Sequence, residues 1–307
     1  MMSVGQRRIL IFGAGVIGSF YGAKFAEAGI KVTLLARGKR LDMLRREGLR
    51  YHENGKVKRV KVEVIDQLKS DDIYDYIFVP VRYDHVEKAL HALKDNQSPT
   101  IVTMTNIPTG YAPWLDIVGD RLLPAFPSAG GEIKGGVVYA QFGPSALQAT
   151  TFGEVNGQES ERVKGLAELF RKAEIASSIS KNMTAFQITH AAWVVGMNKV
   201  IYTDKGIMSH AEAVSPETVR RMTSTIKAYV GVLEKAEVPI TPAKFKLILK
   251  VPDWLMTFAL GRLLRTKMVS DVLLGGHASV VRPEIEMLDK SFIDFLRNKK
   301  ISIPDSL

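Results

Sequence analysis

A glycine motif near the start of the chain has the spacing of a dinucleotide-binding turn. The letters GAGVIG begin at Gly13 and read G-x-G-x-x-G. In this pattern Gly13 makes a tight turn, Gly15 lets the backbone approach a pyrophosphate, and Gly18 lets a helix pack closely on a strand. The motif therefore predicts that the chain binds a dinucleotide at this turn.

The residues on either side of the motif predict a strand–helix–strand unit. The apolar run RILIF at 8–12 is typical of a buried strand, residues 17–28 of a helix, and KVTLL at 31–35 of a second strand. Val16 and Ile17 then stand at the start of the helix, where free N–H groups and the helix dipole favour an anion. Because the glycines interrupt the apolar run, we expect no secretory signal peptide here.

Arginine stands where NAD-binding domains carry an acid. An Asp or Glu at the end of the second strand binds the ribose hydroxyls of NAD. Here the strand continues into ARGKR, where Arg37 offers a guanidinium suited to bidentate contact with a phosphate. Lys39 or Arg40 can add positive charge. We therefore expect NADP rather than NAD, although an exposed arginine without a ligand is the alternative.

Composition limits the remaining classes of function. The 307 residues include no cysteine, which excludes disulfides and thiolate ligands and fits a cytoplasmic protein; we expect no metal site. The net charge is +10, and residues 37–61 hold ten Lys or Arg against three acids, so this segment carries +7. We interpret it as a solvated helix and hairpin or as part of an anion site. No nucleic-acid-binding motif accompanies it.

No apolar run is long enough to span a bilayer, so we expect no membrane partner. The nearest candidate, residues 254–264, is too short. We interpret it as a buried or dimer-facing helix, which makes a homodimer possible.

Strand and helix patterns alternate in the first part of the chain and predict a mostly parallel sheet. An Asn54-Gly55 pair within residues 51–65 predicts an inserted hairpin. We expect a Rossmann-like α/β domain over 1–181 and an all-α domain over 182–307. The predicted further strands are 75–81, 100–104, 121–125 and 174–180, with antiparallel β-structure at 136–154, and the predicted long helices are 184–202, 215–236 and 283–299.

A Rossmann domain with arginine at this place, followed by a helical domain of about 130 residues, resembles the ketopantoate reductase (2-dehydropantoate 2-reductase) family. The resemblance covers essentially the whole chain. It implies an NADPH-dependent oxidoreductase that reduces a small 2-oxo acid. Two of the family's site segments match here as Val81-Arg82, with Arg in place of Lys, and as Asn106 in TNIPTG. The resemblance places Arg82 and Asn106 at the cofactor or substrate, while a turn-capping Asn106 is the alternative.

The first helix of the second domain departs from the family. Asn198 matches an Asn of the family, which places its catalytic Lys eight residues earlier, where this chain has His190. Residues eight apart share a helix face, so His190 is expected to point at the same pocket and to serve as general acid. A structural histidine is the alternative.

A late family motif is also altered. It matches at Asp271 and Gly275, but its Arg is replaced by Gly276 and its substrate-binding Glu by Ser279. We expect Ser279 and His277 near the substrate. Since both the Lys and the Glu are absent, ketopantoate itself is in doubt. The alternatives are a non-catalytic NADP-binding protein and an opine or hydroxy-acid dehydrogenase.

Overall fold

The computed structural model describes residues 7–145, 148–203, 206–266 and 278–303. The chain divides into two compact units. The first unit is Met1–Thr105 with Tyr111–Met183, and the second is Asn106–Gly110 with Thr184–Leu307. The sequence-based boundary was placed between residues 181 and 182, and nothing in the sequence indicated that the short loop Asn106–Gly110 goes with the second unit.

The first unit contains an eight-stranded sheet in the order β12-β11-β8-β7-β6-β1-β2-β5. Its strands are parallel except at the β11–β8 pair. The sheet strands are β1 (Arg8–Phe12), β2 (Lys31–Leu35), β5 (Glu63–Ile65), β6 (Tyr76–Val79), β7 (Ile101–Met104), β8 (Leu122–Phe126), β11 (Thr150–Phe152) and β12 (Ser177–Ile179), and the helices are α1 (Val16–Glu27), α2 (Gly38–Glu47), η2 (Tyr83–His85), α3 (Val86–Ala92), α4 (Ala112–Val118), η3 (Gly119–Arg121) and α5 (Glu161–Lys172).

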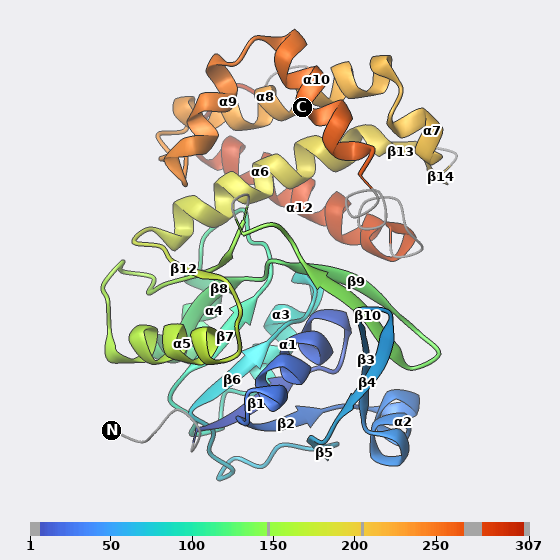
Figure 1. Cartoon of the computed structure of the whole chain (residues 1–307). Coiled ribbons are helices and arrows are strands. Elements are labelled where there is room, and N and C mark those ends of the chain that lie inside the picture. The colour runs from blue at the N-terminus through green and yellow to red at the C-terminus, as the bar shows by residue number, and fades with distance from the viewer. Residues whose placement is uncertain (1–6, 146–147, 204–205, 267–277, 304–307) are drawn as a thin grey trace. The chain divides into compact units, whose positions relative to one another are not determined.

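The order of the strands explains which helices cover which face. The chain moves from β1 to β2 in one direction and from β6 through β7 to β8 in the other. Because parallel crossovers are right-handed, α1 lies on one face and α3 and α4 on the opposite face (Figure 1). This doubly wound arrangement confirms the predicted Rossmann-like fold.

A second, four-stranded sheet in the first unit has the order β4-β3-β10-β9. The predicted hairpin is present as β3 (Leu49–Glu53) and β4 (Lys56–Val60), and the antiparallel pair is β9 (Ala129–Lys134) and β10 (Val137–Phe142). The hairpin turn fits the Asn-Gly signal, since Asn54 and Gly55 have φ of 51° and 78°. The sequence did not show that β3 pairs in parallel with β10. Helix α1 packs between the two sheets (Figure 1).

The second unit is mainly helical, as predicted, with one two-stranded ribbon. Its helices are α6 (Met183–Ile201), α7 (His210–Ala213), α8 (Pro216–Lys235), η4 (Ala243–Phe245), α9 (Lys246–Lys250), α10 (Asp253–Leu264) and α12 (Ala278–Asn298), and the ribbon is β13 (Tyr202–Thr203) with β14 (Gly206–Ile207). The last helix begins five residues before Pro283, where the sequence predicted its start. Among the described helices, none combines the length and apolarity that a membrane span requires.

Helix α10 is only partly buried. Met256, Leu260 and Leu264 pack in a core with residues of α8, such as Val219 and Met222. The opposite face is open, since Trp254 is 72% and Phe258 58% exposed. Of the two interpretations of this segment, a buried helix does not hold for these two side chains, while the dimer-facing one stays a prediction.

Helix α1 lies close to the glycine turn and to β1 at Gly18. A Cβ atom at this position would lie 2.2 Å from the Gly13 carbonyl oxygen and 2.8 Å from side-chain atoms of Ile11 and Pro80. Backbone atoms cannot yield as a flexible side chain can. Gly18 thus sets the distance between helix and sheet.

We expect Gly18→Ala to lower the free energy of unfolding by about 1–3 kcal/mol, because the added methyl group forces the helix away from the strand. Urea unfolding followed by circular dichroism measures this. Gly15→Ala is the matched control, because a Cβ at Gly15 meets no atom within 4 Å. Equal stability of the two variants would contradict the assigned role of Gly18.

Candidate active-site residues

The glycine turn leaves an open cradle at the start of α1. Gly13 has a φ of +124°, and its N–H donates to the Ile11 carbonyl over 3.1 Å. Gly15 is the N-cap of α1 and supplies no side chain to the first N–H groups of the helix. The space that its Cβ would fill is empty to 4 Å. These features fit a pyrophosphate, which needs close backbone approach and donors at Val16 and Ile17.

The basic residues after β2 have two different settings. Arg37 is the exposed N-cap of α2, and Lys39 is exposed one residue beyond Gly38. Within the described part of the chain neither side chain makes a hydrogen bond or an ion pair. Both are therefore available to bind a phosphate. Arg40 instead turns toward the glycine motif and donates to the Ala14 carbonyl over 3.2 Å.

Arg82 lies in the segment beside the glycine turn. Its neighbour Val81 would be 3.5 Å from a Cβ at Gly13. The guanidinium holds Asp84 with two bonds, from Nη2 to Oδ2 over 2.9 Å and from Nε to Oδ1 over 3.2 Å. The cation expected at this place is therefore present but locally neutralised by Asp84.

In the second unit Asn106 and His190 lie in contact although they are 84 positions apart in the sequence. The sequence alone could not show this contact. The His190 Nδ1 lies 2.9 Å from the Asn106 Oδ1. A carbonyl oxygen accepts, so this bond requires the proton on Nδ1 and leaves Nε2 as an acceptor in the neutral ring. The contact joins the loop after β7 to the first long helix of the unit.

Burial determines the protonation state of His190. The side chain is only 8% exposed, and desolvation lowers the pKa from its usual 6.5 to about 3. The imidazole is therefore neutral near pH 7. This works against the proton-donor role expected from the sequence and favours a neutral hydrogen-bonding role.

Asn198 lies two helical turns after His190 on the same buried stretch of α6. It is buried, and its Nδ2 donates to the carbonyl of Val194 over 2.8 Å. The spacing of 190, 194 and 198 places these residues along one helix face, as the sequence predicted.

Lys199 and Thr189, two other residues of α6 that could donate a proton, have polar partners elsewhere in the unit. Lys199 Nζ lies 3.1 Å from Asp289 Oδ2 and donates to the Tyr229 hydroxyl over 3.1 Å. Thr189 accepts a bond from the Thr241 N–H over 3.1 Å. Both residues join helix α6 to other parts of the unit. Of the two residues expected from the late motif, His277 lies outside the described residues, and Ser279 falls in the first turn of α12.

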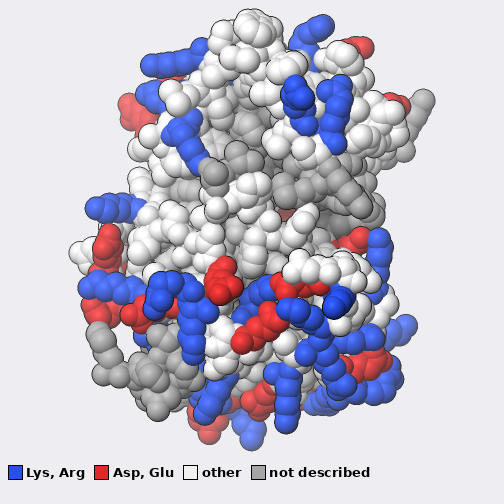
Figure 2. All heavy atoms as spheres, in the orientation of Figure 1, with Lys and Arg blue, Asp and Glu red and all other residues white. Residues whose placement is uncertain are grey.

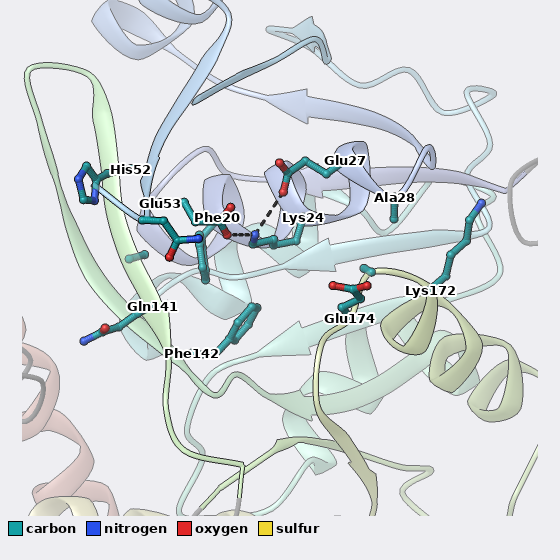
Figure 3. Close-up of a pocket in the computed structure, with 13 residues that line it drawn as sticks. Phe20, Lys24, Glu27, Ala28, His52, Glu53, Gln141, Phe142, Lys172 and Glu174 are labelled. Atoms are coloured by element: carbon teal, nitrogen blue, oxygen red, sulfur yellow. Dashed lines mark hydrogen bonds and ion pairs between the residues drawn. The ribbon is translucent and has the colours of Figure 1, made fainter. Parts of the chain in front are cut away.

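A cavity of about 630 Å³ lies in the first unit, away from the glycine turn (Figure 3). It follows the C-terminal half of α1, with Phe20 and Phe142 side by side on its floor at a ring-centroid distance of 4.8 Å. Its central cation, Lys24, is paired with Glu27 over 3.2 Å and with Glu53. The sequence did not indicate this cavity, because its lining comes from four separate segments.

Part of the basic segment at residues 37–61 is paired with acids. Arg45 pairs with Asp66, and Arg46 and Arg50 with Glu47. Figure 2 accordingly shows Lys and Arg interspersed with Asp and Glu over the first unit, rather than one uniform positive face. This pattern favours the solvated-surface interpretation for the residues beyond Arg40.

Comparison with known proteins finds a family model that matches part of the chain. The model described as Ketopantoate reductase PanE/ApbA matches residues 9–157. Over these residues the chain is similar to the ketopantoate reductase family. The match includes the glycine turn, Arg37, Arg82 and Asn106, whereas His190 and Asn198 lie beyond it.

Two relatives carry the name 2-dehydropantoate 2-reductase. A 2-dehydropantoate 2-reductase of Mesorhizobium japonicum is 26% identical over 200 residues, which are 56% of this chain and 59% of that protein. One of Archaeoglobus fulgidus is 29% identical over 192 residues, 61% of this chain and 62% of that protein. The match thus spans about three fifths of the length of these relatives.

A solved structure is similar in fold over nearly the whole chain. The structure of D-mandelate dehydrogenase with NADH and anilino(oxo)acetate has a TM-score of 0.76 at 15% identity, covering 97% of this chain and 94% of that one. At this identity the likeness concerns the fold alone.

The lowered pKa of His190 predicts a pH dependence of stability. The folded-state pKa of about 3 lies below the unfolded value near 6.5, so the unfolded chain binds more protons between these values. The contribution of His190 to the free energy of unfolding is fully present above pH 6.5. It falls as the pH is lowered toward 3, by at most about 1.4 kcal/mol per pH unit.

We expect His190→Gln to remove this contribution and flatten the dependence. Urea unfolding of both proteins at about pH 6 and about pH 5 measures the two slopes, and carboxylate contributions cancel in their difference. Parallel slopes would show that His190 titrates normally in the folded state.

Proposed function

We propose that this protein is an NADPH-dependent oxidoreductase that reduces a small 2-oxo acid. The observation that carries the proposal is the open cradle at Gly15, together with Arg37 at the end of β2, which has no side-chain partner among the described residues. The bound dinucleotide would supply a hydride to the carbonyl carbon. In this proposal the first unit binds NADPH, and the second unit supplies groups that orient the substrate.

The residues of the chain then have separate roles. Val16 and Ile17 donate backbone N–H groups to the pyrophosphate, while Arg37 and Lys39 bind the 2′-phosphate. Arg82, beside the glycine turn, contributes to the same cofactor site. Each of these tasks is binding rather than proton transfer.

Asn106 and Asn198 would hydrogen-bond the carbonyl or hydroxyl of the substrate. His190 orients Asn106 through the 2.9 Å bond to its Oδ1. Because the ring is neutral, its Nε2 accepts a hydrogen bond and is suited to take the proton from a hydroxyl in the oxidative direction. In the reductive direction the protonated ring must form transiently against the cost of its burial. Ser279 and His277 remain proposed substrate neighbours.

A second candidate function is a non-catalytic NADP-binding protein. The lowered pKa of His190 is the observation that favours it, since no lysine stands at this place and the imidazole resists protonation. Dinucleotide binding without turnover on any 2-oxo acid would support this candidate.

We also propose that the protein forms a homodimer through the exposed face of α10. Trp254 and Phe258 are large apolar side chains that the chain itself leaves uncovered. Aromatic residues of this size are enriched where subunits meet.

We expect NADPH to bind at least about tenfold more tightly than NADH, because a charge-assisted bidentate contact of Arg37 contributes about 1.5–3 kcal/mol. Arg37→Ala should remove most of this preference and leave NADH affinity unchanged. Calorimetric titration of both dinucleotides measures the ratio. Equal affinities in the unaltered protein would refute NADP selectivity.

We expect ketopantoate to be a poor substrate in a panel of 2-oxo acids followed by NADPH oxidation. The Lys and Glu of the family are replaced by His190 and Ser279, and a positioned proton donor contributes about 10²–10⁴ in rate.

With the best substrate of the panel, His190→Gln should lower kcat by about 10²-fold or more and leave NADPH affinity unchanged. Ketopantoate turnover near the median enzyme rate of about 10 per second would contradict the substrate prediction. Undiminished turnover in His190→Gln would remove His190 from the reaction.

A further inference from the structure

Arg40 joins three backbone segments of the first unit at the glycine turn. Its Nε donates to the Ala14 carbonyl over 3.2 Å, its Nη1 to the Gly136 carbonyl over 2.9 Å, and its Nη2 to the Ser19 hydroxyl over 3.1 Å. Ser19 in turn donates its hydroxyl hydrogen to the same Ala14 carbonyl over 3.0 Å. Two donors thus hold one carbonyl inside the G-x-G-x-x-G motif.

The orientation of the Ala14 carbonyl decides where the next N–H points. The only cis peptide bond among the described residues is Thr241-Pro242, so the Ala14–Gly15 peptide is trans. In a planar trans peptide the C=O and N–H groups point in opposite directions. With the Ala14 oxygen held toward Arg40 and Ser19, the Gly15 N–H points away from them.

We propose that Arg40 is a positioning residue that fixes the Ala14–Gly15 peptide so that the Gly15 N–H faces the pyrophosphate of the dinucleotide. This inference rests on the proposed cofactor site and adds to it a residue that acts on the turn rather than on the 2′-phosphate. Arg37 would then contact the 2′-phosphate, while Arg40, three positions later, would hold the turn that faces the pyrophosphate.

The acceptors of Arg40 are neutral groups, two carbonyls and a hydroxyl. The guanidinium is half-buried and pairs with no carboxylate among the described residues, and burial, with the nearby Arg50, lowers its pKa. An uncompensated cation behind the glycine turn favours an anion on its open side. Charge and geometry act in the same direction here.

The other end of the Arg40 contact is a rigid turn of the second sheet. Gly135 and Gly136 connect β9 to β10 with φ of 55° and 78°. Arg50 from β3 donates to the Gly135 carbonyl over 2.9 Å, as Arg40 does to that of Gly136. The second sheet thereby anchors the arginine that holds the dinucleotide turn.

The test compares Arg40→Met with Arg45→Met. Both remove one positive charge from α2, but the Arg45 side chain is exposed and pairs with Asp66 on the surface. We expect Arg40→Met to weaken NADPH and NADH by the same factor, about tenfold, because the pyrophosphate is common to both. Amide hydrogen exchange in the segment 13–19 of the cofactor-free protein should become faster. Arg45→Met should change neither quantity.

Two outcomes of the titrations would overturn the proposal. Loss of NADPH affinity alone would make Arg40 a 2′-phosphate ligand, and equal losses in Arg45→Met would assign the effect to net charge. Arg40→Lys separates charge from geometry, since lysine keeps the charge but lacks the planar fork of donors. We expect it to restore at most part of the affinity, and full restoration would refute positioning.

Failure of the proposed function is distinguishable from failure of this inference. If the unaltered protein binds neither dinucleotide, the proposed function is refuted. The amide hydrogen exchange rate of residues 13–19 tests, without any ligand, whether Arg40 fixes the turn. An unchanged rate in Arg40→Met refutes the positioning role. Should Arg40→Met not fold, Ser19→Ala removes the other donor to Ala14. It should weaken both dinucleotides equally, by a factor of about three or more.

Discussion

The contact of α1 with β1 at Gly18 is the constraint on which the first unit depends. It brings the helix so close that the Gly13 carbonyl lies within 2.2 Å of where a Cβ would be. With the helix at this distance, its N-terminus opens at Gly15 and its other side meets the second sheet. The open cradle lies at the N-terminal end of this helix, and the cavity beside Lys24 lies along its C-terminal half.

Three arginines of the first unit differ in what their guanidinium groups contact. Arg37 is exposed and has no partner in the described part of the chain, so its charge is available to a ligand. Arg40 is half-buried and its donors are used by the backbone of three segments. The Arg82 guanidinium donates two hydrogen bonds to the Asp84 carboxylate. Residue type alone does not distinguish a ligand-binding cation from one that holds the fold.

The chemistry proposed for the second unit depends on one buried histidine. Burial keeps the His190 imidazole neutral and orients it toward Asn106. A lysine at the same place would bring a permanent charge and a different route for the proton. The similarity of residues 9–157 to the ketopantoate reductase family covers the glycine turn, whereas His190 lies beyond it.

The sequence by itself determined the Rossmann-like unit, its glycine turn, the Asn54-Gly55 hairpin and the helical second unit. These features follow from local spacing: three glycines, alternating apolar runs and turn residues with positive φ. Only the tertiary structure decided the parallel pairing of β3 with β10, the exposure of Trp254, the Asn106–His190 contact and the three bonds of Arg40. Each of these joins segments distant in sequence or depends on desolvation, and neither distance in space nor burial is encoded in the spacing of nearby residues.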